Sequence, residues 1–145
     1  MKVNALEAGD SMGLSLCLSA REVSDFARLA GDENPIHHDP EAARRAGYAR
    51  PVISGAQLSS RLMGLSATHF SCGASSSAER SMLGLGFRFS FHRPVLCDEQ
   101  VQLEWRVVSV RHRPALGGHI ALLEGDVRNA EGQVAIKAEG KVLAR

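Results

Sequence analysis

The sequence predicts an α+β fold in which an antiparallel sheet of about five strands wraps around one long central helix. Three observations support this prediction. After one opening strand, the first half of the chain has the spacing of helices, and the second half changes to the two-residue period of strands. Between them lies a mainly apolar stretch, residues 55–70, without any Asp or Glu. A sheet with one apolar face must pack that face against another element, and a helix formed by this stretch can fill that role.

The chain is expected to begin with a strand and a helix. In residues 13–20, Leu14, Leu16 and Leu18 alternate with smaller residues, as in a half-buried strand. In residues 21–31, apolar residues recur at helical spacing, and a glycine stands where helices commonly end. The apolar positions are Val23, Phe26, Ala27, Leu29 and Ala30, and the glycine is Gly31.

Two more helices are expected before the strands of the second half. A short one spans residues 39–47, with Asp39 as a candidate N-cap and Pro40 in the first turn, where proline is tolerated. The central helix is expected to start near Gly55 and to end at about His69. Its apolar pattern is wide enough to leave little exposed surface.

Four long strands are expected after the polar segment 71–79, which has the small residues of a surface loop. The first strand alternates apolar and other residues, and three more follow at 101–113, 119–129 and 133–144. The alternating apolar residues of the first strand are Leu83, Leu85, Phe87, Phe89 and Phe91.

The glycines of that first strand, Gly84 and Gly86, suit close backbone approach or strong curvature. A curved antiparallel sheet around a central helix is the hotdog fold. We expect residues 1–145 to form a single domain of this kind.

Composition and charge argue against several classes of function. The chain has 145 residues with 17 Lys and Arg against 16 Asp and Glu, so no charge excess favours nucleic acid. No apolar run approaches the ~20 residues that cross a bilayer. Cys17, Cys72 and Cys97 fit neither a disulfide framework nor a metal-site spacing. We therefore expect a cytoplasmic protein without a nucleic-acid partner, membrane partner or metal site.

A polar loop, GDENPIHHDP at residues 31–40, separates the first two helices. Pro35 fixes its own φ and biases Asn34 away from helix, so the loop has limited freedom. The bend can turn Asp32 and His37 toward one point, where a carboxylate and an imidazole can share acid–base work on one water. The alternative is an ordinary helix-ending turn, with Asp32 capping backbone amides and His37 facing solvent.

The stretch FARLAGDENPIHHDPEAARRAGYARPVISG resembles the signature of the MaoC-like dehydratases, also called (R)-specific enoyl-CoA hydratases or the hydratase 2 family. The matching residues are Phe26, Gly31, Asp32, Asn34, Pro35, Ile36 and His37. The resemblance implies that Asp32 and His37 are the catalytic pair. It implies reversible hydration of a trans-2-enoyl-CoA to the (R)-3-hydroxyacyl-CoA, without metal or redox cofactor. With the exposed sheet edges of the predicted fold, it also implies a homodimer.

Three further residues are candidates for substrate binding. The Asn34 amide can bond either local backbone or substrate. The Gly55 N–H, at the start of the central helix, can donate to the thioester carbonyl, although the glycine could instead serve tight helix–sheet packing. Ser54 is expected to be a helix N-cap or a small pocket-wall residue. Family members commonly have His at the Ser54 position, so this departure leaves substrate preference open.

Other polar residues near the motif are expected to have ordinary roles. The motif spacing selects His37 rather than His38, and Asp39 already has a helix-cap role, so substitutions at His38 and Asp39 are expected to do little. The remaining histidines have no motif context and are expected at the surface or at strand edges. They are His69, His92, His112 and His119.

Two other functions stay open for this fold. A hotdog acyl-CoA thioesterase would place a carboxylate on or beside the central helix, and residues 55–70 contain none. A non-catalytic acyl-CoA-binding subunit is disfavoured by the intact Asp32 and His37 but kept open by Ser54. Acyl length, physiological direction, and the choice between CoA and a carrier protein also stay open.

Overall fold

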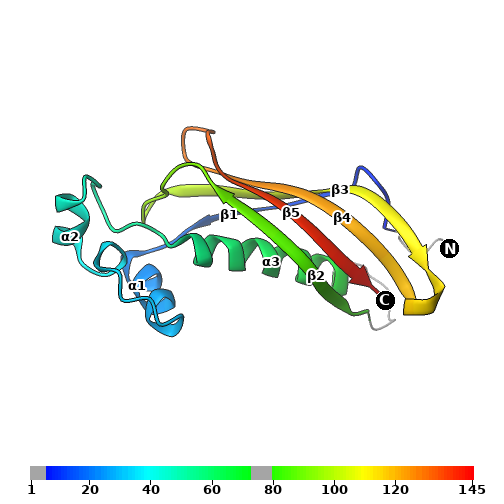
Figure 1. The fold of residues 1–145 in the computed structure, drawn as a ribbon. Helices are drawn as coiled ribbons and strands as arrows, with labels where there is room; N and C mark the ends of the chain where they lie inside the picture. Colours follow the sequence, from blue (N-terminus) through cyan, green and yellow to red (C-terminus); the bar gives the residue numbers. More distant parts are fainter. Residues whose placement is uncertain (1–5, 73–79) are drawn as a thin grey trace.

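The computed structural model describes residues 6–72 and 80–145, which form one strand, three α-helices and then four strands (Figure 1). The expected loop at 71–79 lies mostly outside the described residues, and residues 71 and 72 belong to the central helix. The helices are α1 (Ala20–Leu29), α2 (Pro40–Arg45) and α3 (Gly55–Cys72), with short 3-10 turns η1 (Pro35–His37) and η2 (Pro114–Leu116). The strands are β1 (Ser11–Cys17), β2 (Met82–Phe91), β3 (Gln100–Arg113), β4 (Gly118–Arg128) and β5 (Val134–Ala144).

The strands form one five-stranded sheet in the order β1-β3-β4-β5-β2, with every neighbouring pair antiparallel. The sheet curves over α3, and α1 and α2 lie beyond its end, near the start of α3 (Figure 1). This arrangement confirms the predicted hotdog fold. The loop between α1 and α2 therefore lies where the central helix begins.

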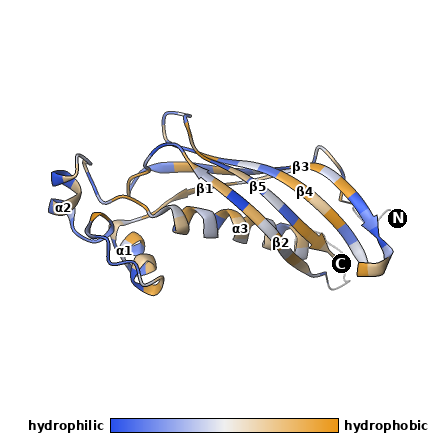
Figure 2. Ribbon diagram, viewed as in Figure 1, coloured by the Kyte–Doolittle hydropathy of each residue, from blue (hydrophilic) through white to orange (hydrophobic). Residues whose placement is uncertain are grey.

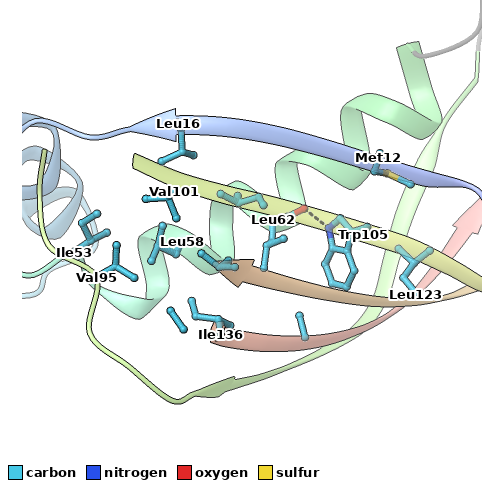
Figure 3. Close-up of a cluster of buried hydrophobic side chains, with 14 of the residues drawn as sticks. Met12, Leu16, Ile53, Leu58, Leu62, Val95, Val101, Trp105, Leu123 and Ile136 are labelled. Atoms are coloured by element: carbon cyan, nitrogen blue, oxygen red, sulfur yellow. Dashed lines mark hydrogen bonds between the residues drawn. The ribbon is translucent and has the colours of Figure 1, made fainter. Parts of the chain in front are cut away.

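The core lies between α3 and the covered face of the sheet (Figure 3). Hydrophilic and hydrophobic residues alternate along the strands (Figure 2), so each strand turns one set of side chains toward the helix. Leu58 and Leu62 of α3 pack against this face, and Trp105 of β3 is fully buried beside them. Burial of such side chains contributes about 1.5–3 kcal/mol each.

A β-bulge in β2 changes which side chains face the core. The register shifts by one residue between Gly84 and Gly86, which moves the following side chains to the other face. Met82 accordingly packs against the core, whereas Leu83 is 47% exposed. The expectation that the alternating residues from Leu83 to Phe91 share one face is therefore wrong for Leu83. It is also wrong for Leu85, the extra residue of the bulge, which is 48% exposed. The bulge falls between the two glycines for which close backbone approach or strong curvature was expected.

The central helix is buried on one side only. Leu62 is fully buried, but Arg61 is exposed and Met63 is 40% exposed. The expectation of little exposed surface is wrong because a single sheet covers one side of a helix. On α1, Leu29 is 87% exposed and also departs from the expected apolar face. Within residues 6–72 and 80–145, no helix has the length and apolar character needed to cross a membrane.

Candidate active site

The loop that holds the candidate catalytic residues starts at the end of α1. Gly31 has a left-handed φ of 74°, a conformation that glycine adopts at little cost, and so ends the helix as expected. The next backbone N–H, that of Asp32, donates to the Ala27 carbonyl at 2.8 Å. The Asp32 backbone is thereby anchored to the last turn of the helix.

The structure brings Asp32 and His37 together. His37 Nε2 lies 3.3 Å from Asp32 Oδ2. The His37 side chain is 8% exposed and the Asp32 side chain is 37% exposed, so the carboxylate is on the solvent side of the pair. His37 therefore does not face solvent, as the helix-ending-turn alternative would have it.

The hydrogen bonds of His37 determine where its protons lie. Nδ1 is 2.6 Å from the backbone carbonyl of Val52, which can only accept, so Nδ1 carries a hydrogen. Nε2 faces the Asp32 carboxylate oxygen, so a proton held between the two atoms would join them. With that proton the pair offers one acid and one base at the same point.

Asn34 bonds local backbone, one of the two roles considered for it. Its side-chain oxygen accepts from the Ile36 N–H at 3.4 Å and caps the η1 turn. Its own backbone N–H donates to Asp32 Oδ1 at 2.9 Å. One carboxylate oxygen of Asp32 is thus held by the loop, and the other faces His37.

The start of α3 is tied to the same loop. Val52 donates its N–H to Ile36 at 2.9 Å and accepts from His37, so the two segments pair. Ser54 Oγ accepts from the Gln57 N–H at 3.2 Å, which confirms Ser54 as a helix N-cap. No acceptor among residues 6–72 and 80–145 takes the N–H of Gly55, which is partly exposed. This free N–H at a helix start can donate a hydrogen bond to an anionic or carbonyl oxygen.

Gly55 is also closely packed. A Cβ at this position would lie 2.5 Å from Cε1 of Phe91, the last residue of β2. Phe91 is 60% exposed, so its ring can move at the cost of this contact. The packing role considered for Gly55 therefore has structural support, and it does not conflict with a donor role for the N–H.

His38 and Asp39, which follow His37 in the chain, have different roles. Asp39 Oδ1 accepts from the Glu41 N–H at 2.9 Å, which confirms the expected helix cap. His38 was expected to have no special role, but its ring hydrogen-bonds both Ser24 Oγ and the Asp32 carbonyl. No sequence pattern predicted the Ser24 contact, which joins residues fourteen positions apart.

The remaining histidines lie mostly at the surface. His92, His112 and His119 are exposed, as expected, and His69 is half-buried on α3. The rings of His112 and His119, on neighbouring strands, have centroids 4.8 Å apart. Across the described part of the chain, no group of three or more His, Cys, Asp or Glu is placed to hold a metal ion.

Comparison with known proteins identifies the family. The model of the MaoC-like domain family matches residues 7–117. The chain belongs to the MaoC-like domain family. It is 31% identical over 142 residues to the (R)-specific enoyl-CoA hydratase of Aeromonas caviae, covering 98% of both chains.

Solved structures show the same fold. The (R)-hydratase from A. caviae involved in PHA biosynthesis superposes with a TM-score of 0.81 at 30% identity, covering 96% of this chain and 97% of that one. Unliganded R-hydratase PhaJ1 from Pseudomonas aeruginosa gives a TM-score of 0.76 at 20% identity, covering 96% of this chain and 82% of that one. The second comparison bears on the fold alone.

Proposed function

We propose that this protein reversibly hydrates trans-2-enoyl-CoA to (R)-3-hydroxyacyl-CoA, with Asp32 and His37 as the acid–base pair. The observation that carries the proposal is the 3.3 Å contact between His37 Nε2 and Asp32 Oδ2. It lies on the loop with the family's signature, in a chain that belongs to the MaoC-like family. The stereochemistry and the CoA carrier come from the similarity to the A. caviae hydratase.

The pair can perform both proton transfers of the reaction. Water adds its oxygen to C3 and gives one proton to the member of the pair that acts as base. The other member delivers its proton to C2, where the former π electrons form the new C–H bond. Afterwards the pair again holds one proton in total. It can return to its starting state by proton transfer across the same contact.

The start of α3 can bind the thioester. Negative charge develops on the thioester oxygen as water adds to C3, and preorganised N–H donors stabilise such charge. The free N–H of Gly55 is the donor that we propose, with the Ser54 cap holding the first turn in place. Asn34 would act by holding the loop in shape and not by binding substrate, because its side-chain oxygen accepts from the Ile36 N–H.

We also propose a homodimer in which two copies of β2 pair. This strand lies at one edge of the sheet and has ten residues, most of them apolar. Leu83, Leu85 and Phe91 are 47%, 48% and 60% exposed along it. Pairing across a two-fold axis would cover this edge, and a long apolar edge strand is otherwise prone to aggregate.

We also propose that residues 1–145 form one domain that works in the cytoplasm without a cofactor. Cys17, Cys72 and Cys97 are all free thiols, which suits a reducing compartment. Adding water to a double bond passes no electrons to an acceptor, so a redox cofactor is not required.

Crotonyl-CoA distinguishes the proposed hydratase from the two other functions. We expect loss of the enoyl absorbance when the protein is added, with no release of free thiol. Thiol release would indicate a thioesterase, and binding without either change would indicate a non-catalytic subunit. Chiral analysis of the product would test the (R) assignment.

Sedimentation at micromolar concentration tests the dimer. We expect the wild-type protein to sediment as a dimer and Leu85→Asp as a monomer, because the charge would lie in the β2 pair. Val108→Asp is a matched control, since Val108 is also 48% exposed but lies on β3, away from the sheet edge. A monomeric wild type would contradict the proposal.

A further inference from the structure

We propose that His38 is a positioning residue, which holds the Asp32 backbone so that the carboxylate stays against His37. The inference rests on the proposed function. His38 Nε2 is 2.7 Å from the backbone carbonyl of Asp32, and His38 Nδ1 is 2.7 Å from Oγ of Ser24 on α1. The ring therefore joins the catalytic loop to the preceding helix.

The two partners determine the proton positions on the His38 ring. A backbone carbonyl only accepts, so Nε2 carries a hydrogen and donates to Asp32. In the neutral ring Nδ1 then accepts, and the buried Ser24 hydroxyl donates to it. Both ring nitrogens of His38 are engaged, so neither is available to exchange a proton with substrate. This is why we assign positioning rather than acid–base catalysis to His38.

With His38 in place, Asp32 is fixed at three points. Its N–H donates to Ala27 at 2.8 Å, its Oδ1 accepts from the Asn34 N–H at 2.9 Å, and its carbonyl accepts from His38. Removing the bond from His38 would free the peptide that follows Asp32 to rotate. That peptide leads through Glu33 to Asn34, so its rotation would also disturb the bond from the Asn34 N–H to Oδ1.

The catalytic contact is sensitive to such a shift. Its 3.3 Å length is already near the limit of a hydrogen bond, and 37% of the Asp32 side chain is exposed, so no dense packing holds the carboxylate. A displacement of about 1 Å at a reacting group can cost about 10²-fold in rate. His38 is one of the groups that prevents this displacement.

Two amide substitutions separate the two ends of the ring. The side-chain N–H2 of His38→Gln can replace Nε2 and donate to Asp32, whereas His38→Asn reaches only the Nδ1 position, near Ser24. If His38 positions Asp32, His38→Gln should retain kcat to within about 3-fold. His38→Asn and His38→Ala should lower kcat by about 10-fold to 10²-fold with KM nearly unchanged. Ser24→Ala should have a smaller effect than His38→Asn.

The experiment measures kcat and KM for crotonyl-CoA hydration, with thermal unfolding of every variant. If His38→Ala does not fold, the comparison of His38→Gln with His38→Asn still decides. If His38→Asn retains kcat while His38→Gln loses it, the role of His38 is toward Ser24 alone. A rise in KM with unchanged kcat would show substrate contact. Either result overturns the inference, as do variants that all match the wild type. A wild type without hydratase activity overturns the proposed function itself.

Discussion

The Trp105 indole N–H donates to the backbone carbonyl of Leu62 at 2.7 Å, which links strand β3 to the middle of the central helix (Figure 3). Both residues are fully buried. The bond uses a main-chain acceptor on the helix, so it fixes how far α3 lies along β3 as well as how closely it packs.

We expect Trp105→Phe to lower the free energy of unfolding by about 2 kcal/mol, from a lost buried hydrogen bond and the space left by the smaller ring. Denaturant unfolding measures this loss. Val108→Ala on the same strand is the control, since Val108 is 48% exposed and its loss should cost no more than about 0.5 kcal/mol. Equal losses in the two variants would contradict the role assigned to the indole.

Loss of either member of the proposed acid–base pair, Asp32 or His37, should reduce turnover by about 10²-fold or more. Asp32→Asn retains an oxygen for the Asn34 N–H, so the loop should stay in place. His37→Asn is preferable to His37→Ala, because its N–H2 can still donate to the Val52 carbonyl while nothing replaces Nε2. Steady-state kinetics with crotonyl-CoA measures the effect.

The double variant of Asp32 and His37 should be little worse than either single variant, since the two act as a unit. Asp39→Asn, which keeps the helix cap, and His119→Ala, at an exposed position, are controls that should match the wild type. Near wild-type hydration by both single variants would disprove the assignment.

Gly55→Ala should lower turnover by about 10²-fold if the added methyl group displaces the thioester from the Gly55 N–H. The same methyl group would also meet the Phe91 ring, so the single variant is ambiguous. Adding Phe91→Ala removes that clash. We expect the double variant to stay as slow as Gly55→Ala; recovery to the rate of Phe91→Ala would mean that Gly55 serves packing only.

Ser54→Ala should lower the free energy of unfolding by about 1 kcal/mol, because the Gln57 N–H loses its N-cap acceptor. Ser60→Ala on the same helix is the control, since Ser60 is exposed and its hydroxyl bonds a helix carbonyl instead. Ser54→His, which restores the commoner family residue, is expected to retain turnover. Thermal unfolding and crotonyl-CoA kinetics check the two effects separately.

The three cysteines should differ in reactivity toward a disulfide reagent. Burial and the neighbouring Asp98 raise the pKa of the Cys97 thiol. At a given pH, a smaller fraction of Cys97 is therefore thiolate than of an ordinary cysteine, and the thiolate is the reactive form. Cys17 and Cys72 are exposed. We expect two thiols to react quickly in the native protein and the third only after unfolding. In a Cys17→Ser, Cys72→Ser variant no fast reaction should remain, and a fast reaction there would contradict the burial of Cys97.

Local patterns in the sequence were sufficient to predict much of this structure. The change of period at the middle of the chain predicted the helix and the strands, and the signature loop predicted the meeting of Asp32 and His37. The Ser54 and Asp39 caps followed from residue type and position. Each of these features depends on residues that lie close together along the chain.

The features that were missed depend on distant contacts or on one extra residue. Because of the bulge in β2, Leu83 faces away from the core. The alternation of apolar residues alone does not show where a strand's register shifts. The His38–Ser24 bond needs α1 to fold back on the loop, and the indole bond to Leu62 needs the helix to be docked on the sheet. Tertiary packing decides such contacts.

The strand order also has a consequence for how the chain is synthesised. β2 is made before β3 and β4, yet its partner in the sheet is β5, which follows both. Until β5 has left the ribosome, the apolar strand β2 has no neighbouring strand in its own chain to form backbone hydrogen bonds with. Its Phe side chains also lack the complete sheet that they belong to. During that interval the nascent protein presents a segment suited to chaperone binding, and to pairing between adjacent chains on one messenger.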